Sequence, residues 1–176
     1  MGLWDVREHY EDWGPVYDNY YRLQMTVPPL PIMQTPERCP ELVKDAVANA
    51  ARVIWVDPSA AANRLRIAIE QLLDAKRIPR STRVGVKLAP LKLHGRIERL
   101  RATHPSVAEL LEAVKWIGNQ GSHEDSLGVA DVLEGAQLFE HALAQMYDTA
   151  PAEIRRRAMQ INKAKKVRSS RGLSKR

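Results

Sequence analysis

The chain has 176 residues, 44% of them hydrophobic, and a formal net charge of +6. This length supports one sizeable core with appendages. No apolar run is long enough to cross a bilayer, and the N-terminus lacks the basic-then-apolar order of a secretory signal, so we expect a cytoplasmic protein without membrane contact. A single cysteine, Cys39, excludes an internal disulfide and a zinc site built on thiolate pairs. Because no adjacent base is evident, we expect Cys39 to be an ordinary buried thiol rather than a nucleophile.

Residues 1–36 form an aromatic and proline-rich extended arm. Six of the ten aromatic residues lie before residue 22, interleaved with five acids. Such a segment is too short to fold alone, so we expect it to pack on the body, on a second copy in a homodimer, or on a partner protein. Stacking on nucleic-acid bases is the alternative, which the carboxylates disfavour because they repel phosphates. The prolines from Pro28 to Pro36 predict an extended connector.

From Pro40 onward, apolar residues recur at three- and four-residue spacing, which predicts helices. Pro40, Pro58 and Pro105 suit first helical positions, and Asp57 is placed to cap the second helix. The predicted helices of the body cover residues 40–56, 58–77, 91–102, 105–117 and 129–147. Residues 78–90 break the pattern and predict a loop, to which residues 83–86 could add a small strand. The body, residues 37–150, is thus predicted to be an all-α bundle of about five helices.

The stretch from Lys115 to His123 does not follow the apolar periodicity of the predicted helices. Here a helical pattern meets a Gly-Asn-x-Gly-x-His sequence. One interpretation is structural: Gly118 is a left-handed C-cap, Asn119 bonds its own turn together with Gly121, and His123 bonds the loop. The other is functional: the turn presents Asn119 and His123 to a ligand. No spacing of His, Asp, Glu or Cys indicates a metal site, and no motif indicates a cofactor.

A second pair of candidate residues lies in the second helix. Arg66 and Glu70 are one turn apart, and an intrahelical ion pair is the plain explanation. The alternative is that Arg66 lies beneath the Asn-Gly-His turn and holds it, or holds a phosphate there, beside Glu70.

Residues 151–176 carry ten Lys or Arg against one acid, a net charge of +9, so the other 150 residues sum to −3. A basic helix is predicted from Pro151, fraying by about Val167, followed by a tail without apolar residues to bury. Such a segment could bind the phosphates of RNA or another nucleic acid, or an acidic partner. The cations we expect to contribute are Arg155, Arg156, Arg157, Lys165 and Lys166.

The motifs Leu65-Arg66-x-x-x-Glu70 and Gly118-Asn119-x-x-x-His123, separated by a Leu-rich helix, resemble the prokaryotic family of domain of unknown function 4145. That family is placed within the higher-eukaryote and prokaryote nucleotide-binding (HEPN-like) helical domains. The resemblance covers roughly residues 42–147. It implies a small helical bundle, alone or attached to restriction and other defence proteins, often after a zinc-binding segment that this chain lacks.

The wider group includes metal-independent ribonucleases whose sites pair an Arg with a His five positions later in the same chain. The site is usually doubled across a homodimer, and Gly118 stands where that Arg would be. His123 could move protons, and Lys115 lies where relatives tend to carry Arg, but Lys lacks the planar fork that grips phosphate. The resemblance therefore favours a non-catalytic module of a prokaryotic defence or nucleic-acid-processing system. It would bind RNA, a nucleotide or a partner protein. A ribonuclease with a degenerate site at His123 and a purely structural adaptor are the alternatives.

Overall fold

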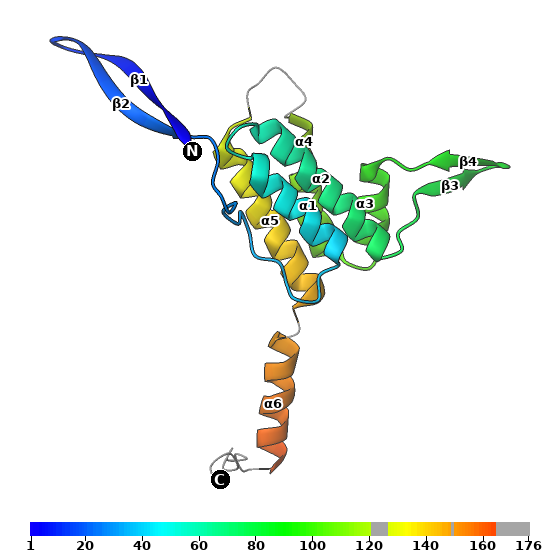
Figure 1. Cartoon of the computed structure of the whole chain (residues 1–176). Helices are drawn as coiled ribbons and strands as arrows, with labels where there is room; N and C mark the ends of the chain where they lie inside the picture. The colour runs from blue at the N-terminus through cyan, green and yellow to red at the C-terminus, as the bar shows by residue number, and fades with distance from the viewer. Residues whose placement is uncertain (121–126, 149, 165–176) are drawn as a thin grey trace.

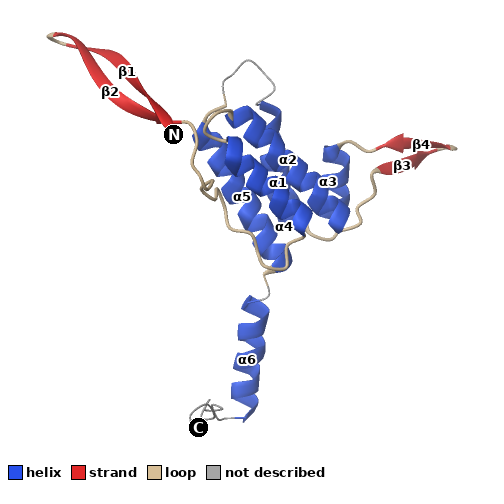
Figure 2. Ribbon diagram, viewed as in Figure 1, coloured by secondary structure: helices blue, strands red, loops and turns tan. Residues whose placement is uncertain are grey.

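Five helices, α1 to α5, build the body of the molecule in a computed structural model that describes residues 1–120, 127–148 and 150–164 (Figure 1). Two β-hairpins and a sixth helix project from this body (Figure 2). The described part is therefore mostly helical but not all-α. The prediction of a mostly helical fold is confirmed, and the prediction that the fold is all-α is wrong because two small antiparallel sheets are present.

The helices follow the predicted apolar stripes, with ends shifted by a few residues. They run over Glu41–Val53 (α1), Pro58–Ala75 (α2), Leu93–Arg101 (α3), Pro105–Gln120 (α4) and Val129–Tyr147 (α5). Asp57 caps α2 as predicted, since its Oδ1 accepts a hydrogen bond from the backbone N of Ala60 at 2.8 Å. The short turn between α1 and α2 makes these helices antiparallel neighbours.

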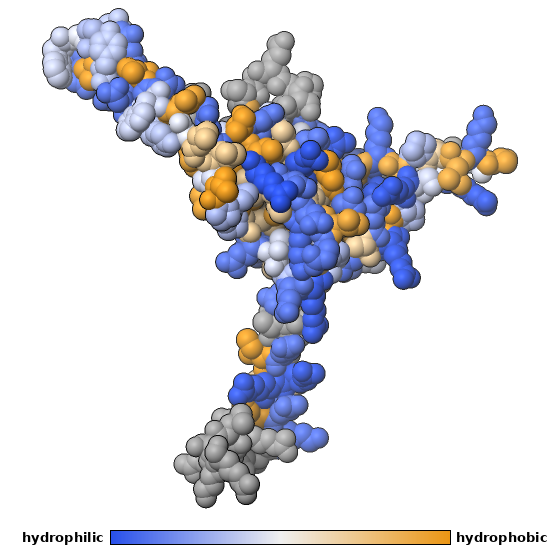
Figure 3. Space-filling view, viewed as in Figure 1, coloured by the Kyte–Doolittle hydropathy of each residue, from blue (hydrophilic) through white to orange (hydrophobic). Residues whose placement is uncertain are grey.

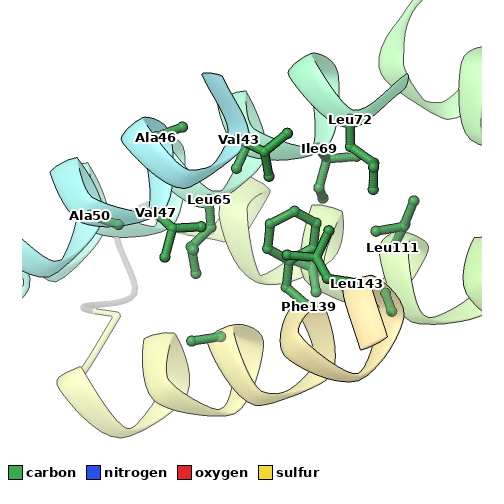
Figure 4. Packing of buried hydrophobic residues seen from close by; sticks show 14 of the residues in the cluster. Val43, Ala46, Val47, Ala50, Leu65, Ile69, Leu72, Leu111, Phe139 and Leu143 are labelled. Atoms are coloured by element: carbon green, nitrogen blue, oxygen red, sulfur yellow. The ribbon is translucent and has the colours of Figure 1, made fainter. Parts of the chain in front are cut away.

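Helix α2 is the centre of the bundle because it packs against each of α1, α3, α4 and α5. Its buried face, which includes Leu65, Ile69 and Leu72, meets the ring of Phe139 on α5 (Figure 4). These side chains are almost completely removed from solvent, and each buried aliphatic or aromatic side chain contributes about 1.5–3 kcal/mol to the free energy of folding. The central position of α2 also fixes where Arg66 lies.

The N-terminal arm is a regular antiparallel β-hairpin of β1 (Gly2–Glu11) and β2 (Gly14–Leu23) rather than an irregular extended segment. The register runs from Gly2 opposite Leu23 to Glu11 opposite Gly14, and Gly14 supplies a positive φ of 128° in the turn. The hairpin extends away from the body and packs against no other described helix or strand (Figure 1). Of the expected alternatives, packing of the aromatic segment on the body is wrong, whereas its docking on a second copy or a partner stays a prediction.

The predicted loop at residues 78–90 contains a second hairpin, β3 (Ser81–Val84) and β4 (Lys87–Pro90). Gly85, at φ 62°, lies in its turn, so only the first half of the suggested strand at 83–86 is correct. A clamp holds the base of this hairpin: Asp74 on α2 pairs with Arg80 before β3 and, at 2.7 Å, with Arg96 on α3. Arg96 is 5% exposed and also donates to the carbonyl oxygen of Ile78 at 3.0 Å.

Gly118 does not end α4, because the helix continues to Gln120. The prediction of a left-handed C-cap at Gly118 is therefore wrong. Gly118 is an interior residue of α4 that lies against α2. A Cβ at this position would meet the carbonyl oxygen of Ala62 at 3.4 Å and the Cβ of Arg66 at 3.5 Å. These are ordinary van der Waals distances, so position 118 lies at the contact of α4 with α2 and has room for a methyl group.

Helix α6 (Ala150–Ala164) extends from the end of the body opposite the first hairpin (Figure 1). Its described surface is mostly hydrophilic (Figure 3), and it packs against no other described helix or strand. Among the residues described, none of the helices combines the length and apolarity that a bilayer crossing requires.

Candidate anion-binding site

A pocket of about 400 Å³ opens where α2, α3 and α4 meet. Helix α2 contributes Arg66, the start of α3 contributes Lys92, Leu93 and His94, and α4 contributes Lys115, Trp116 and Asn119. Three of these side chains are cations and none of the lining residues is an acid. We call this cavity the cationic pocket.

Lys115 is the most deeply placed cation of the cationic pocket, being 5% exposed. Its Nζ lies 3.4 Å from Glu112 Oε1, 3.5 Å from His94 Nδ1 and 4.1 Å from the ring centre of Trp116. A buried ammonium group needs such partners because desolvation is costly. The distances to oxygen and nitrogen are long for hydrogen bonds, so Lys115 keeps donor capacity for an anion in the pocket.

Glu112, behind Lys115, is shared by several positive groups. Its Oε1 lies 3.2 Å from His94 Nδ1, and its Oε2 accepts from Arg101 at 2.6 Å. Arg101 also bonds Glu98, and this hydrogen bond lowers the pKa of the Glu98 carboxyl. His94, Glu98 and Glu112 each place a ligand atom within 4.8 Å of the others, but Arg101 and Lys115 already neutralise the carboxylates. We therefore interpret the cluster as an ion-pair network rather than a metal site.

Arg66 is the least satisfied cation of the cationic pocket. Its Nε is buried and has no hydrogen-bond partner in the described part of the chain. The nearest carboxylate oxygen is that of Glu70, at 4.0 Å, which is an ion pair one helical turn away and too long for a hydrogen bond. Buried donors are normally bonded, so the guanidinium group is available to a ligand.

The structure brings together candidate residues from two separate parts of the sequence: Arg66 of α2 and Lys115 and Asn119 of α4 line one pocket. Gly118 lies beneath them at the α2–α4 contact, and Glu70 is paired with Arg66. Gly121 and His123, like Lys165 and Lys166, lie outside the described residues. Arg155, Arg156 and Arg157 are exposed on α6, remote from the pocket (Figure 1).

Sequence reasoning missed Lys92, His94 and Trp116, which complete the cationic pocket. Lys92 precedes α3 at the N-cap position and His94 follows in its first turn. No motif marks them, because they reach the pocket only through the packing of α3 on α4. The available signal was a Lys-x-His sequence at a helix start, where free backbone N–H groups favour anions.

Fold and pocket together define a small helical domain with a cationic pocket at a junction of three helices. A family model described as a domain of unknown function (DUF4145) matches residues 48–168, more than half of the chain, and the chain belongs to this family. The match covers the pocket and most of the bundle. Neither the curated proteins nor the solved structures contain a match to this chain.

Proposed function

We propose that this protein is a non-catalytic RNA-binding module, in which the cationic pocket holds a phosphate and α6 adds further phosphate contacts. The observation that carries the proposal is the composition of the pocket: Arg66, Lys92 and Lys115 converge there with His94 and Asn119, and no acid lines it. Such a set offers charge-assisted hydrogen bonds to phosphate oxygens.

The pocket suits a phosphate within a longer strand better than an isolated ion. The start of α3 faces it, so backbone N–H groups and the helix dipole add to the attraction of the side chains. Trp116 is 60% exposed at the rim and can stack on an unpaired base. The arginines at 155–157 extend the basic surface. Within a prokaryotic defence or nucleic-acid-processing system, such a module would hold RNA for another component.

The test is the salt dependence of binding to a short fluorescein-labelled single-stranded RNA, followed by fluorescence anisotropy. The pocket variant is Arg66→Gln/Lys92→Gln, and its matched control is Arg83→Gln/Lys87→Gln, which removes two positive charges from the exposed second hairpin. We expect the pocket variant to lose about tenfold in affinity and the slope of log K against log salt to fall by about 1.4, the value for two lost contacts. The control should change either quantity far less.

Equal losses in both variants would show that RNA is attracted by overall charge and would overturn the pocket as the site. No binding by the intact protein at low salt would overturn the proposal in favour of a partner-protein adaptor.

A specific observation keeps the degenerate ribonuclease as the second candidate. Asn119 lines the pocket, and His123 follows it by four residues in the sequence. His94, inside the pocket, is a second group that could move a proton. Gel analysis of the labelled RNA after long incubation distinguishes the two. We expect intact RNA; cleavage that disappears in His123→Ala or His94→Ala would replace the binding proposal with an enzymatic one.

A further inference from the structure

The hairpin of β1 and β2 has two chemically different faces. In its register Trp4 pairs with Tyr21, Glu8 with Tyr17 and Tyr10 with Pro15, which places these side chains on one face. We call Trp4, Val6, Tyr10, Tyr17 and Tyr21 the aromatic face; each is at least 50% exposed. The opposite face is polar, and its side chains satisfy one another: Tyr20 donates to Asp5 Oδ2 at 2.9 Å, and Arg7 stacks over the Tyr20 ring.

The aromatic face is uncovered. Trp4 contacts Tyr21 edge to face, with ring centres 5.4 Å apart, and the Tyr17 hydroxyl donates to Glu8 Oε1 at 3.3 Å. The hairpin packs on no other described helix or strand (Figure 1). A two-stranded hairpin alone in water is marginal, and a contiguous exposed apolar patch marks an interaction site. A hairpin this long and regular therefore indicates that another protein surface binds its aromatic face.

A groove of about 360 Å³ with complementary chemistry lies along α1. Its lining includes Pro29 and Pro31 of the connector and Val47, Ala48 and Ala51 of α1. We call it the proline groove. It is fixed to the body, because Met33 is buried beside it and the backbone N of Gln34 donates to Glu140 Oε2 on α5 at 3.0 Å.

The proline groove and the hairpin differ in net charge, and the groove offers exposed prolines to aromatic side chains. Aromatic side chains are the groups that bind extended proline-rich segments in proteins. The lining includes two cations, Lys44 and Arg52, and no acid. Residues 2–23 carry five acids and two arginines, a net charge of −3, and the acid that the register places on the aromatic face itself is Glu8. Lys44 is already paired with Glu41, whereas Arg52 is bonded only to the amide oxygen of Asn49 among the contacts described.

In the structure, the hairpin does not reach the proline groove of its own chain. The N-terminal ammonium group of Met1 donates to the carbonyl oxygen of Met25 at 2.7 Å, and Gln24 and Met25 donate back to Met1, which closes the base of the hairpin. Only three residues separate Met25 from Pro29. The ribbon leaves the body in the direction away from the connector (Figure 1). The short connection between Met25 and Pro29 does not limit how the hairpin approaches the proline groove of a second copy.

We propose that two copies of this chain form a symmetric dimer by exchanging hairpins, with the aromatic face of each seated on the proline groove of the other. Each copy supplies both surfaces, so the two contacts are related by a two-fold axis and the assembly closes. Each hairpin of ten-residue strands extends about 33 Å from its base, enough to reach a neighbouring body. The dimer goes beyond RNA binding and does not depend on it.

The test measures the mass of the full chain in solution by light scattering and sedimentation. It compares the intact protein with variants in which the aromatic face or the proline groove is altered. The hairpin variant is Trp4→Ser/Tyr17→Ser, matched by Val86→Ser/Leu88→Ser on the exposed second hairpin. The groove variant is Ala48→Glu/Arg52→Glu, matched by Asn63→Glu/Arg64→Glu on the exposed face of α2. We expect twice the 19.9 kDa chain mass for the intact protein and both controls, and a dimer dissociation constant raised roughly tenfold to a hundredfold in either disabled variant.

The decisive experiment mixes the hairpin variant with the groove variant. The hairpin of the groove variant can still bind the proline groove of the hairpin variant, so we expect the mixture to form a heterodimer. A chain that carries both sets of substitutions should form no dimer with the groove variant. Circular dichroism checks folding, and Tyr10→Ser/Tyr21→Ser replaces the hairpin variant if that protein does not fold. An intact protein of monomer mass, a groove variant that dimerises like the wild type, or a mixture that stays monomeric would each overturn the proposal.

Discussion

At the scale of single residues, Gly118 shows how one position in a motif can be interpreted in two opposite ways. In sequence, a glycine after an apolar helical stripe resembles a helix stop. In the structure it is an interior helical residue that faces Ala62 and Arg66 at van der Waals distance. The two interpretations predict opposite effects of adding a methyl group.

Gly118→Ala should stabilise the protein by about 1 kcal/mol, because alanine costs less conformational entropy in a helix and its Cβ meets neighbours at 3.4 Å or more. Gly118→Leu should destabilise it by about 2 kcal/mol, since a larger side chain would force α4 away from α2. Urea unfolding of both variants measures this. A loss of stability in Gly118→Ala would point back to a left-handed cap.

Cys39 is an ordinary buried thiol, as the sequence predicted. It is 3% exposed, and burial raises the pKa of its thiol. We expect the native protein to react with an aromatic disulfide reagent at neutral pH roughly tenfold or more slowly than the urea-unfolded chain. Absorbance of the released thiolate follows the reaction. Equal rates in the two states would contradict the burial.

At the scale of elements, the second hairpin and the start of α3 are held by the clamp of Asp74 with Arg80 and Arg96. The hydrogen bond from Arg80, followed by that from Arg96, lowers the pKa of the Asp74 carboxyl below its ordinary value of 3.8. A carboxyl with a depressed pKa in the folded state stabilises the fold at every pH above its unfolded value. That contribution is lost as pH falls through the folded pKa.

Asp74→Asn should therefore lower the free energy of unfolding by about 2 kcal/mol at neutral pH, because it leaves the buried Arg96 without its counter-charge. The difference between the variant and the wild type should begin to shrink as pH falls below about 4, where the unfolded carboxyl becomes protonated, and should vanish below the lowered pKa of the native carboxyl. Thermal unfolding across that range tests it. A difference that persists unchanged at pH 3 would show that charge is not the cause.

The elements that sequence predicted best are those with local signals. Asp57, Pro58 and the apolar stripe of residues 129–147 fixed helix starts and faces through capping and periodicity. The two hairpins were missed for a different reason. Their strands join residues by pairing across a turn, as Trp4 joins Tyr21, and acids and arginines among the aromatics hide the alternation. Likewise, Lys92 and His94 join the pocket only through the docking of α3.

At the scale of the whole molecule, α6 is separable from the body. It packs on no other described helix or strand, so a chain shortened by residues 150–176 should unfold within about 2 °C of the full chain. The same truncation should weaken RNA binding and reduce its salt dependence, since ten of the 27 Lys and Arg are removed. Calorimetry and anisotropy on one preparation test both. A drop of many degrees would show that α6 supports the core.

The two hairpins and α6 project in three directions from the helical body (Figure 2). Such an outline raises friction with solvent well above that of a sphere of the same mass. A size-exclusion column calibrated with globular standards will therefore overstate the mass of a single chain. An early-eluting peak would be expected from the monomer as well as from the exchanged dimer, and only a shape-independent mass can tell one from the other.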